Sequence, residues 1–159
     1  LLNAGNNTIT ISGSGSSYAP DIDSITVATT TTQYLADAAQ FNGKGISIVA
    51  SPEGTDGKKL AVGPGGNYKV TFDVSAVSSG PHSVLILYLS GAPASADVKA
   101  SSSKTVAVKF PSSSGDPSNS NVVGVANVNL DLLQGSNTIT ISSVSKETAP
   151  DLDSIIVVE

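Results

Sequence analysis

The stretch Asn137–Val158, NTITISSVSKETAPDLDSIIVV, decides the predicted fold because a near copy of it opens the chain. Residues 7–27 read NTITISGSGSSYAPDIDSITV. Aligned without a gap at an offset of 130 residues, segments 5–27 and 135–157 are identical at 14 of 23 positions. Each copy alternates isoleucine with threonine and then enters a second apolar run after Ala-Pro-Asp, which is typical of two strands joined by a loop.

The repeat predicts how the chain is divided. Segment 34–159 is expected to be one complete β-sandwich, segment 1–27 the terminal hairpin of a preceding repeat copy, and segment 28–33 (ATTTTQ) a Thr-rich linker. A lone hairpin is marginal in water. Its apolar side chains are therefore expected to pack on the following domain or on another chain: Ile9, Ile11, Ile22, Ile25 and Val27.

Short alternating segments predict an all-β fold. No segment has a sustained 3.6-residue apolar period, and turn residues recur every eight to twelve positions, which favours a two-sheet sandwich. Phe41-Asn42-Gly43 is predicted to be a turn. The expected strands are 1–12, 22–27, 45–50, 60–62, 68–74, 83–89, 106–110 and 122–132, followed by the repeated hairpin.

Composition excludes several classes of protein. The chain of 159 residues carries a net charge of −5 with no basic cluster, so nucleic acid and anionic membranes are not expected partners. It has no cysteine, which excludes disulfides, thiolate catalysis and cysteine-based zinc sites. The sequon Asn6-Asn7-Thr8 makes Asn6 a predicted glycosylation site, in keeping with a secreted, extracellular protein.

The sequence does not predict an enzyme. Its single histidine, His82, is expected to be a packing residue near the edge of the core. The carboxylate pairs Asp21/Asp23 and Asp151/Asp153 are not expected to converge on one substrate.

Four motifs in order across 34–159 resemble those of carbohydrate-binding modules of the family 35/family 6 type. They are YLADAA (34–39), GPHSVLILY (80–88), LQGSNTI (133–139) and APDLDSI (149–155). The resemblance implies a jelly-roll β-sandwich that binds polysaccharide or another glycan and is itself non-catalytic. It also implies that such a module is often attached to a glycoside hydrolase.

The resemblance further implies a structural calcium ion between the opening strand and the closing aspartate. Asp37 and Asp153 match the family's ligands, and carbonyls of the loop Thr55–Lys58 are candidates to complete the shell of oxygens that Ca²⁺ prefers. The departure is Leu35, which stands where the family has a glutamate.

The sugar site departs from the family as well. Sugar rings commonly stack on exposed aromatic side chains, but the chain has no tryptophan. Tyr18 of the N-terminal copy corresponds to Thr148 of the complete one. The candidate sugar-binding residues, expected on loops, are Tyr88, Asp116, Asn119, Lys146 and Glu147.

Two hypotheses of different class remain open. The first is a non-catalytic carbohydrate-binding module of a secreted multi-module protein that targets cell-wall-type polysaccharide. The second is a structural or adhesive repeat that has lost sugar binding and associates with itself through β-strand complementation by the N-terminal hairpin.

Overall fold

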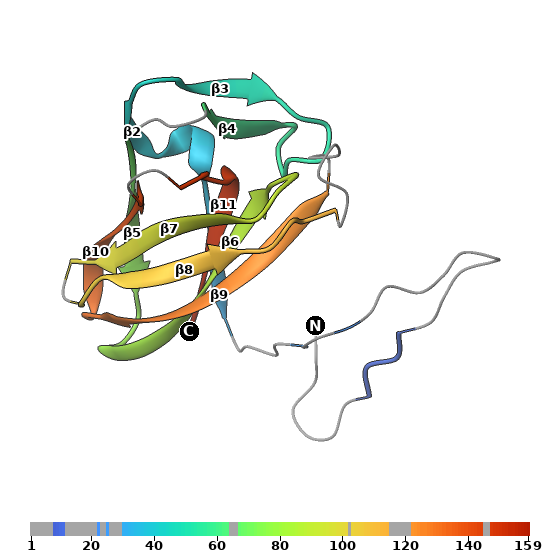
Figure 1. The fold of residues 1–159 in the computed structure, drawn as a ribbon. Coiled ribbons are helices and arrows are strands. Elements are labelled where there is room, and N and C mark those ends of the chain that lie inside the picture. The colour runs from blue at the N-terminus through green and yellow to red at the C-terminus, as the bar shows by residue number, and fades with distance from the viewer. Residues whose placement is uncertain are drawn as a thin grey trace.

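Two antiparallel sheets stack face to face in the computed structural model of the chain (Figure 1). The structure describes residues 8–11, 22, 25, 30–63, 67–101, 103–114, 122–144 and 147–159. Within these ranges the sole helical element is the 3₁₀ turn η1 (Ala36–Ala38), and no helix there has the length and apolarity needed to cross a membrane. The all-β prediction is confirmed.

The first sheet has six strands. Five follow the order β3-β4-β11-β6-β9, and β1 pairs with β11 beside them. The strands are β1 (Thr31–Leu35), β3 (Ile46–Ala50), β4 (Lys58–Val62), β6 (Gly80–Leu89), β9 (Val123–Leu132) and β11 (Asp151–Val158).

The second sheet has five strands in the order β2-β5-β10-β7-β8. They are β2 (Gln40–Gly43), β5 (Tyr68–Ala76), β7 (Ala94–Ala100), β8 (Val106–Phe110) and β10 (Gly135–Ser143). The second sheet buries one face, as the alternating burial of β5 and β10 shows.

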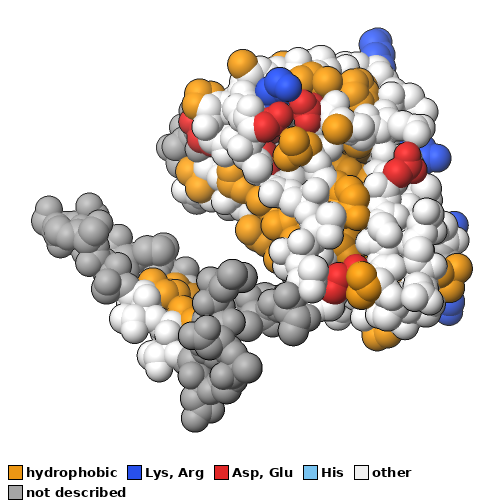
Figure 2. Space-filling view, turned by 180° about the vertical axis from the view of Figure 1, so that it is seen from behind, with side chains coloured by type: hydrophobic (Ala, Val, Ile, Leu, Met, Phe, Trp, Pro, Cys, Tyr) orange, Lys and Arg blue, Asp and Glu red, His pale blue; other side chains and the backbone are white. Residues whose placement is uncertain are grey.

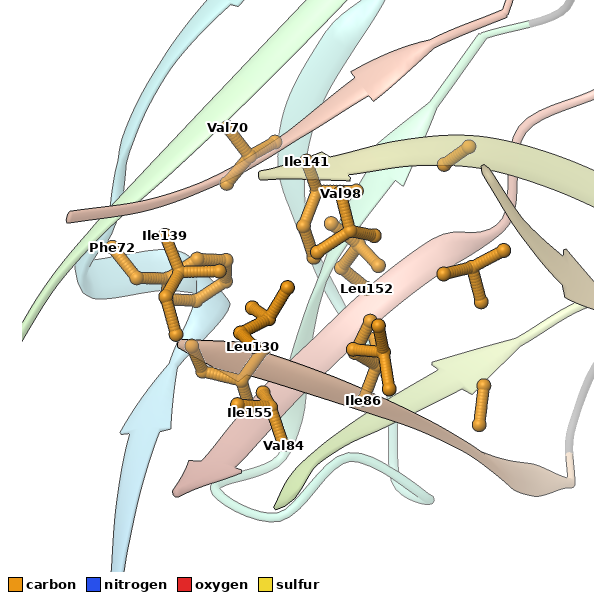
Figure 3. Packing of buried hydrophobic residues seen from close by; sticks show 14 of the residues in the cluster. Val70, Phe72, Val84, Ile86, Val98, Leu130, Ile139, Ile141, Leu152 and Ile155 are labelled. Atoms are coloured by element: carbon orange, nitrogen blue, oxygen red, sulfur yellow. The ribbon is translucent and has the colours of Figure 1, made fainter. Parts of the chain in front are cut away.

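The core lies between the two sheets (Figure 3). Phe72 and Ile139 of the second sheet face Ile155 and Leu130 of the first, and all four side chains are at most 2% exposed. Full burial of such a side chain contributes about 1.5–3 kcal/mol, so these alternating positions account for much of the stability of the domain.

The stretch Asn137–Val158 supplies the central strand of each sheet, β10 in the second and β11 in the first. β10 pairs with β5 on one side and β7 on the other, while β11 pairs with β6 on one side and with β1 and β4 on the other. Asn137, at the start of β10, is 5% exposed and bonds the backbone of the preceding turn, donating to Leu133 O (2.7 Å) and Gly135 O (2.9 Å) and accepting from Leu133 N (3.0 Å).

The structure corrects three local predictions. Phe41-Asn42-Gly43, predicted to be a turn, belongs to strand β2 (Gln40–Gly43), which pairs with the first residues of β5. Strand β7 was missed because ASADVKA has few β-branched or aromatic residues. Thr31–Gln33, assigned to the linker, belong to β1 and pair with the end of β11.

The N-terminal copy differs from its counterpart in the described positions. Thr8–Ile11 are not in a strand and lie apart from the sandwich in Figure 1. The isoleucines at positions 9, 11, 22 and 25 are 48–51% exposed. The expected packing of these four side chains on the following domain is therefore not found. Val27 lies outside the described residues.

Candidate functional site

Tyr88 is not a loop residue, and this prediction was wrong. It lies in β6, is 3% exposed, and donates its hydroxyl hydrogen to Pro111 O at 2.9 Å. Its ring packs edge-on against Phe110, with centroids 4.9 Å apart, and a Cβ at Gly124 would lie 2.6 Å from it. Burial raises the pKa of the Tyr88 hydroxyl. A ring enclosed in this way offers no face to a sugar.

The other predicted sugar-binding residues follow the ends of strands. Glu147 is exposed in the connection between β10 and β11. The neighbouring Thr148 accepts a backbone hydrogen bond from Ser95 N at 2.9 Å, which ties this connection to β7. Asp116, Asn119 and Lys146 lie outside the described residues, as does Asn6. Their roles stay predictions.

Serine hydroxyls tie two loops together next to the segment that carries Asp116 and Asn119. Ser113 donates its backbone N–H to Ser90 O (2.9 Å), and its Oγ accepts from Ser90 N (3.0 Å). Ser112 Oγ donates to Gly91 O at 3.1 Å. The loop after β8 is thus hydrogen-bonded to the loop after β6, so the two loops hold each other in place at this end of the sandwich.

Asp37, the first predicted calcium ligand, is paired with a lysine. Lys58 Nζ lies 2.9 Å from Asp37 Oδ2 and 3.5 Å from Asp56 Oδ2. The hydrogen bond from Lys58 lowers the pKa of Asp37, and the same bond raises the pKa of Lys58. The Asp37 side chain is 15% exposed and that of Lys58 is 51% exposed. One ammonium group therefore serves two carboxylates.

Asp153, the second predicted ligand, is held by hydrogen-bond donors. Its Oδ1 accepts from Thr55 N (2.7 Å), and its Oδ2 accepts from Thr55 Oγ1 (2.6 Å) and Ser154 Oγ (2.8 Å). Gln33 Nε2 donates in turn to Thr55 Oγ1 and Ser154 Oγ. The register of β11 shifts between Leu152 and Ser154, and such a bulge re-aims the side chain it carries.

Asp151 makes a separate set of contacts on the same side of β11. Its Oδ1 accepts from Val62 N (2.8 Å) and its Oδ2 pairs with Lys59 Nζ (2.9 Å). Since β4 pairs with β11 at a single residue, Leu60 with Leu152, this carboxylate takes the place of further ladder bonds. Asp151 and Asp153 thus fasten β4 and the loop before it to β11.

These residues do not fit the calcium site that the resemblance implied. Ca²⁺ takes six to eight oxygen ligands, several of them carboxylate. Asp37 is occupied by Lys58, both oxygens of Asp153 are occupied by donors, and the described residues contain no group of three or more His, Cys, Asp or Glu that could hold a metal ion. The hydrogen-bond donors around Asp37 and Asp153 suit carboxylates that bind no metal ion.

The second sheet carries three adjoining hollows beside the solvent-facing side of β5 and β10. The largest, about 490 Å³, shares Tyr34 and Asp73 with a second of about 310 Å³. It shares Ser101 and Thr138 with a third of about 350 Å³, whose lining includes Lys99. We call this set the sheet groove. Hydroxyls, the carboxylates of Asp73 and Asp97, two lysines and one partly buried tyrosine make it a surface suited to a polyhydroxylated ligand.

Charge is dispersed over the surface. On the face drawn in Figure 2, Lys and Arg side chains are few and separated from one another, and polar white surface predominates. This agrees with the low charge content of the sequence, 13%.

No family model matches the sequence, and no curated protein matches it significantly. Solved structures do match. Part of an exo-β-1,3-galactanase from Phanerochaete chrysosporium, in a structure with galactose, is 30% identical with a TM-score of 0.70. The match covers 81% of this chain and 29% of the galactanase, so this chain corresponds to a minor part of that enzyme.

Two self-contained modules match over nearly their whole length. A family 35 carbohydrate-binding module from Clostridium thermocellum is 19% identical, with a TM-score of 0.71 and coverage of 81% of this chain and 98% of the module. A family 35 module from Cellvibrio japonicus is 22% identical, with a TM-score of 0.68 and coverage of 82% and 94%. The chain thus contains a domain with the same two-sheet jelly-roll fold as these two modules.

Proposed function

We propose that this chain is a non-catalytic carbohydrate-binding module that binds cell-wall-type polysaccharide as part of a secreted protein. The observation that carries the proposal is the match of the complete two-sheet domain to modules that consist of nothing else. The likeness to part of a galactanase adds galactan as the first polysaccharide to test. The carboxylates Asp37, Asp151 and Asp153 are each engaged in structural contacts, which supports a domain without catalysis.

The sheet groove is the proposed place for the sugar among the described residues. Thr138, Ser101 and Asp73 offer hydroxyl and carboxylate groups for the hydroxyls of a sugar, and Tyr34 offers an aromatic ring. The groove joins three hollows, so its length suits several sugar units of a chain. The loop residues Asp116, Asn119, Lys146 and Glu147 form the alternative place.

Binding of the full chain to immobilised β-1,3-galactan, xylan, mannan and polyuronate tests the function. Retention on at least one polymer is expected, and retention on none of them contradicts the proposal. Asp73→Asn with Thr138→Val tests the groove, and Asn119→Ala with Glu147→Gln tests the loops. Lys44→Gln, a change in the exposed turn after β2, is the control. The pair that reduces retention identifies the binding surface.

The exposed isoleucines favour a second candidate function, self-association through the N-terminal segment. Four isoleucines that are about half exposed within a short segment are an unusual exposure of apolar surface. Light scattering of the full chain and of the variant Ile9→Ser, Ile11→Ser, Ile22→Ser, Ile25→Ser tests it. A larger particle for the unchanged chain than for the variant supports association, and equal monomeric masses contradict it.

A further inference from the structure

The corner where η1, the β3–β4 loop and β11 meet is held by a lysine and a threonine. In a family 35 type module this is where the resemblance placed a calcium ion, whose task would be to tie these three segments together. Here Lys58 joins Asp37 of η1 to Asp56 of the loop, and Thr55 of that loop joins Asp153 of β11. Every segment that a cation would connect is already connected.

A lysine supplies positive charge at this corner. Two carboxylates, Asp37 and Asp56, lie within 3.5 Å of the single ammonium group of Lys58. An ammonium group has three donors and no acceptor, so it neutralises and bridges carboxylates as a small cation does. A divalent ion placed beside Lys58 would meet like charge, which opposes its binding.

The geometry at Asp153 opposes a metal independently. Its two oxygens receive three donors at 2.6–2.8 Å, one of them a backbone N–H. Asp153 is 3% exposed, and Gln33 Nε2 donates to Thr55 Oγ1 and Ser154 Oγ, the two hydroxyl groups that contact its carboxylate. A cation would have to displace N–H and O–H hydrogens that point at the lone pairs it needs.

We propose that Lys58 is a built-in substitute for the structural cation, so that this domain folds and keeps this corner ordered without calcium. The inference concerns the stability of the fold and stands whether or not the chain binds sugar. It also explains why Leu35 is tolerated where the resemblance expects a glutamate. Where Lys58 supplies the positive charge, there is no metal ion for a carboxylate at position 35 to coordinate.

Thermal unfolding of the full chain, in EDTA and in about 10 mM CaCl₂, tests the proposal. The unchanged chain is expected to unfold at the same temperature in both buffers, within about 1 °C. Lys58→Gln leaves Asp37 and Asp56 close together without a cation. We therefore expect this variant to unfold at a lower temperature in EDTA. In calcium its unfolding temperature is expected to rise by several degrees, because an ion that binds only the folded state stabilises that state.

Three controls complete the design. Lys104→Gln removes one exposed positive charge elsewhere and is expected to behave as the unchanged chain. Lys58→Arg keeps the charge and is expected to stay insensitive to calcium. Asp37→Asn combined with Lys58→Gln removes the carboxylate that calcium would use, so calcium is expected to restore nothing.

Two results would overturn the proposal. One is an increase of several degrees in the unfolding temperature of the unchanged chain on adding calcium, with the same increase lost in EDTA. The other is a Lys58→Gln variant that responds to calcium no more than Lys104→Gln does. The first measurement needs no variant, so the proposal is testable even if Lys58→Gln fails to fold.

Discussion

Tyr34 and Ser75 join the two sheets by a hydrogen bond. The backbone N–H of Ser75, in β5, donates to Tyr34 Oη, in β1, at 2.9 Å. β2 pairs with Tyr68–Thr71, and the rest of β5 has no strand partner on that side within the described part of the chain. The tyrosine hydroxyl therefore satisfies a donor that an edge strand would otherwise present to solvent.

Tyr34→Phe is expected to lower the free energy of unfolding by about 0.5–1.5 kcal/mol, the usual net contribution of one hydrogen bond. The ring stays and continues to pack on the core, so only the hydroxyl contact is removed. Urea unfolding followed by circular dichroism measures the change. An unchanged midpoint would show that water replaces the tyrosine hydroxyl at no cost.

Tyr68→Phe is expected to have the opposite effect. Tyr68 is 3% exposed, and its hydroxyl has no hydrogen-bond partner among the described residues. Burial, with a smaller contribution from Asp97, raises the pKa of this hydroxyl. Since a buried unpaired hydroxyl costs about 1–3 kcal/mol, removing it is expected to leave the urea midpoint unchanged or raise it. A clear loss of stability would indicate that the hydroxyl has a bound water as partner.

Asn137→Ala is expected to destabilise the domain by about 2–4 kcal/mol. The change leaves three backbone groups of the turn before β10 without their partner, at positions 133 and 135. Thermal unfolding measures the loss. Asn7→Ala, the same substitution at the equivalent position of the N-terminal copy, is the matched control and is expected to have no effect. Equal loss in both variants would contradict the assignment of the core strands to the second copy.

The Asp37–Lys58 pair is expected to add stability only between acid and strongly alkaline pH. The pKa of Asp37 lies below its ordinary value of 3.8 in the folded state, so its contribution is present above pH 3.8 and is lost as the pH falls through the lowered pKa. The pKa of Lys58 lies above 10.5, so its contribution is present below pH 10.5 and is lost as the pH rises through the raised pKa.

The difference in unfolding temperature between the unchanged chain and Asp37→Asn, followed across pH, measures this contribution. A constant difference between pH 5 and pH 9 that shrinks below pH 3.8 is expected. A difference that persists in strong acid would show that the asparagine acts through packing and not through charge. The pair is solvent-exposed on the lysine side, so added salt is expected to reduce the difference.

Strand periodicity identified most of the fold but not all of it. Tyr68–Val74 and the repeated hairpin alternate so regularly that the buried face follows from the sequence, and Val70, Phe72, Ile139 and Ile141 are all buried as expected. β7 carries alanine, serine and aspartate where strands usually carry branched residues, and it is a strand because β10 and β8 pair with it on both sides. Its pairing is a tertiary effect that propensity does not report.

The candidate site was harder to predict than the fold. Tyr88 was assigned to a loop because tyrosine is common in sugar sites, but its place in the alternation of β6 puts it inside. The sheet groove was missed because its polar lining residues are mostly ordinary serines, threonines and aspartates that lie on several elements far apart in the sequence. The outward alternation of β5 and β10 was the one signal that could have indicated it.

His82, predicted as a packing residue, is 5% exposed within β6.

The sequence by itself determined the all-β class, the two faces of most strands and the core role of the closing hairpin. Each of these follows from the period-two placement of apolar side chains, a property of neighbouring residues. Only the tertiary structure decided the partners of Asp37, Asp153 and Tyr34. Their bonds to Lys58, Thr55 and Ser75 span 21 to 98 residues, so they form only when distant segments pair within the first sheet or, for Tyr34 and Ser75, when the two sheets are stacked. Hydrophobic burial sets where the strands lie, and strand pairing and sheet stacking then set which polar groups meet.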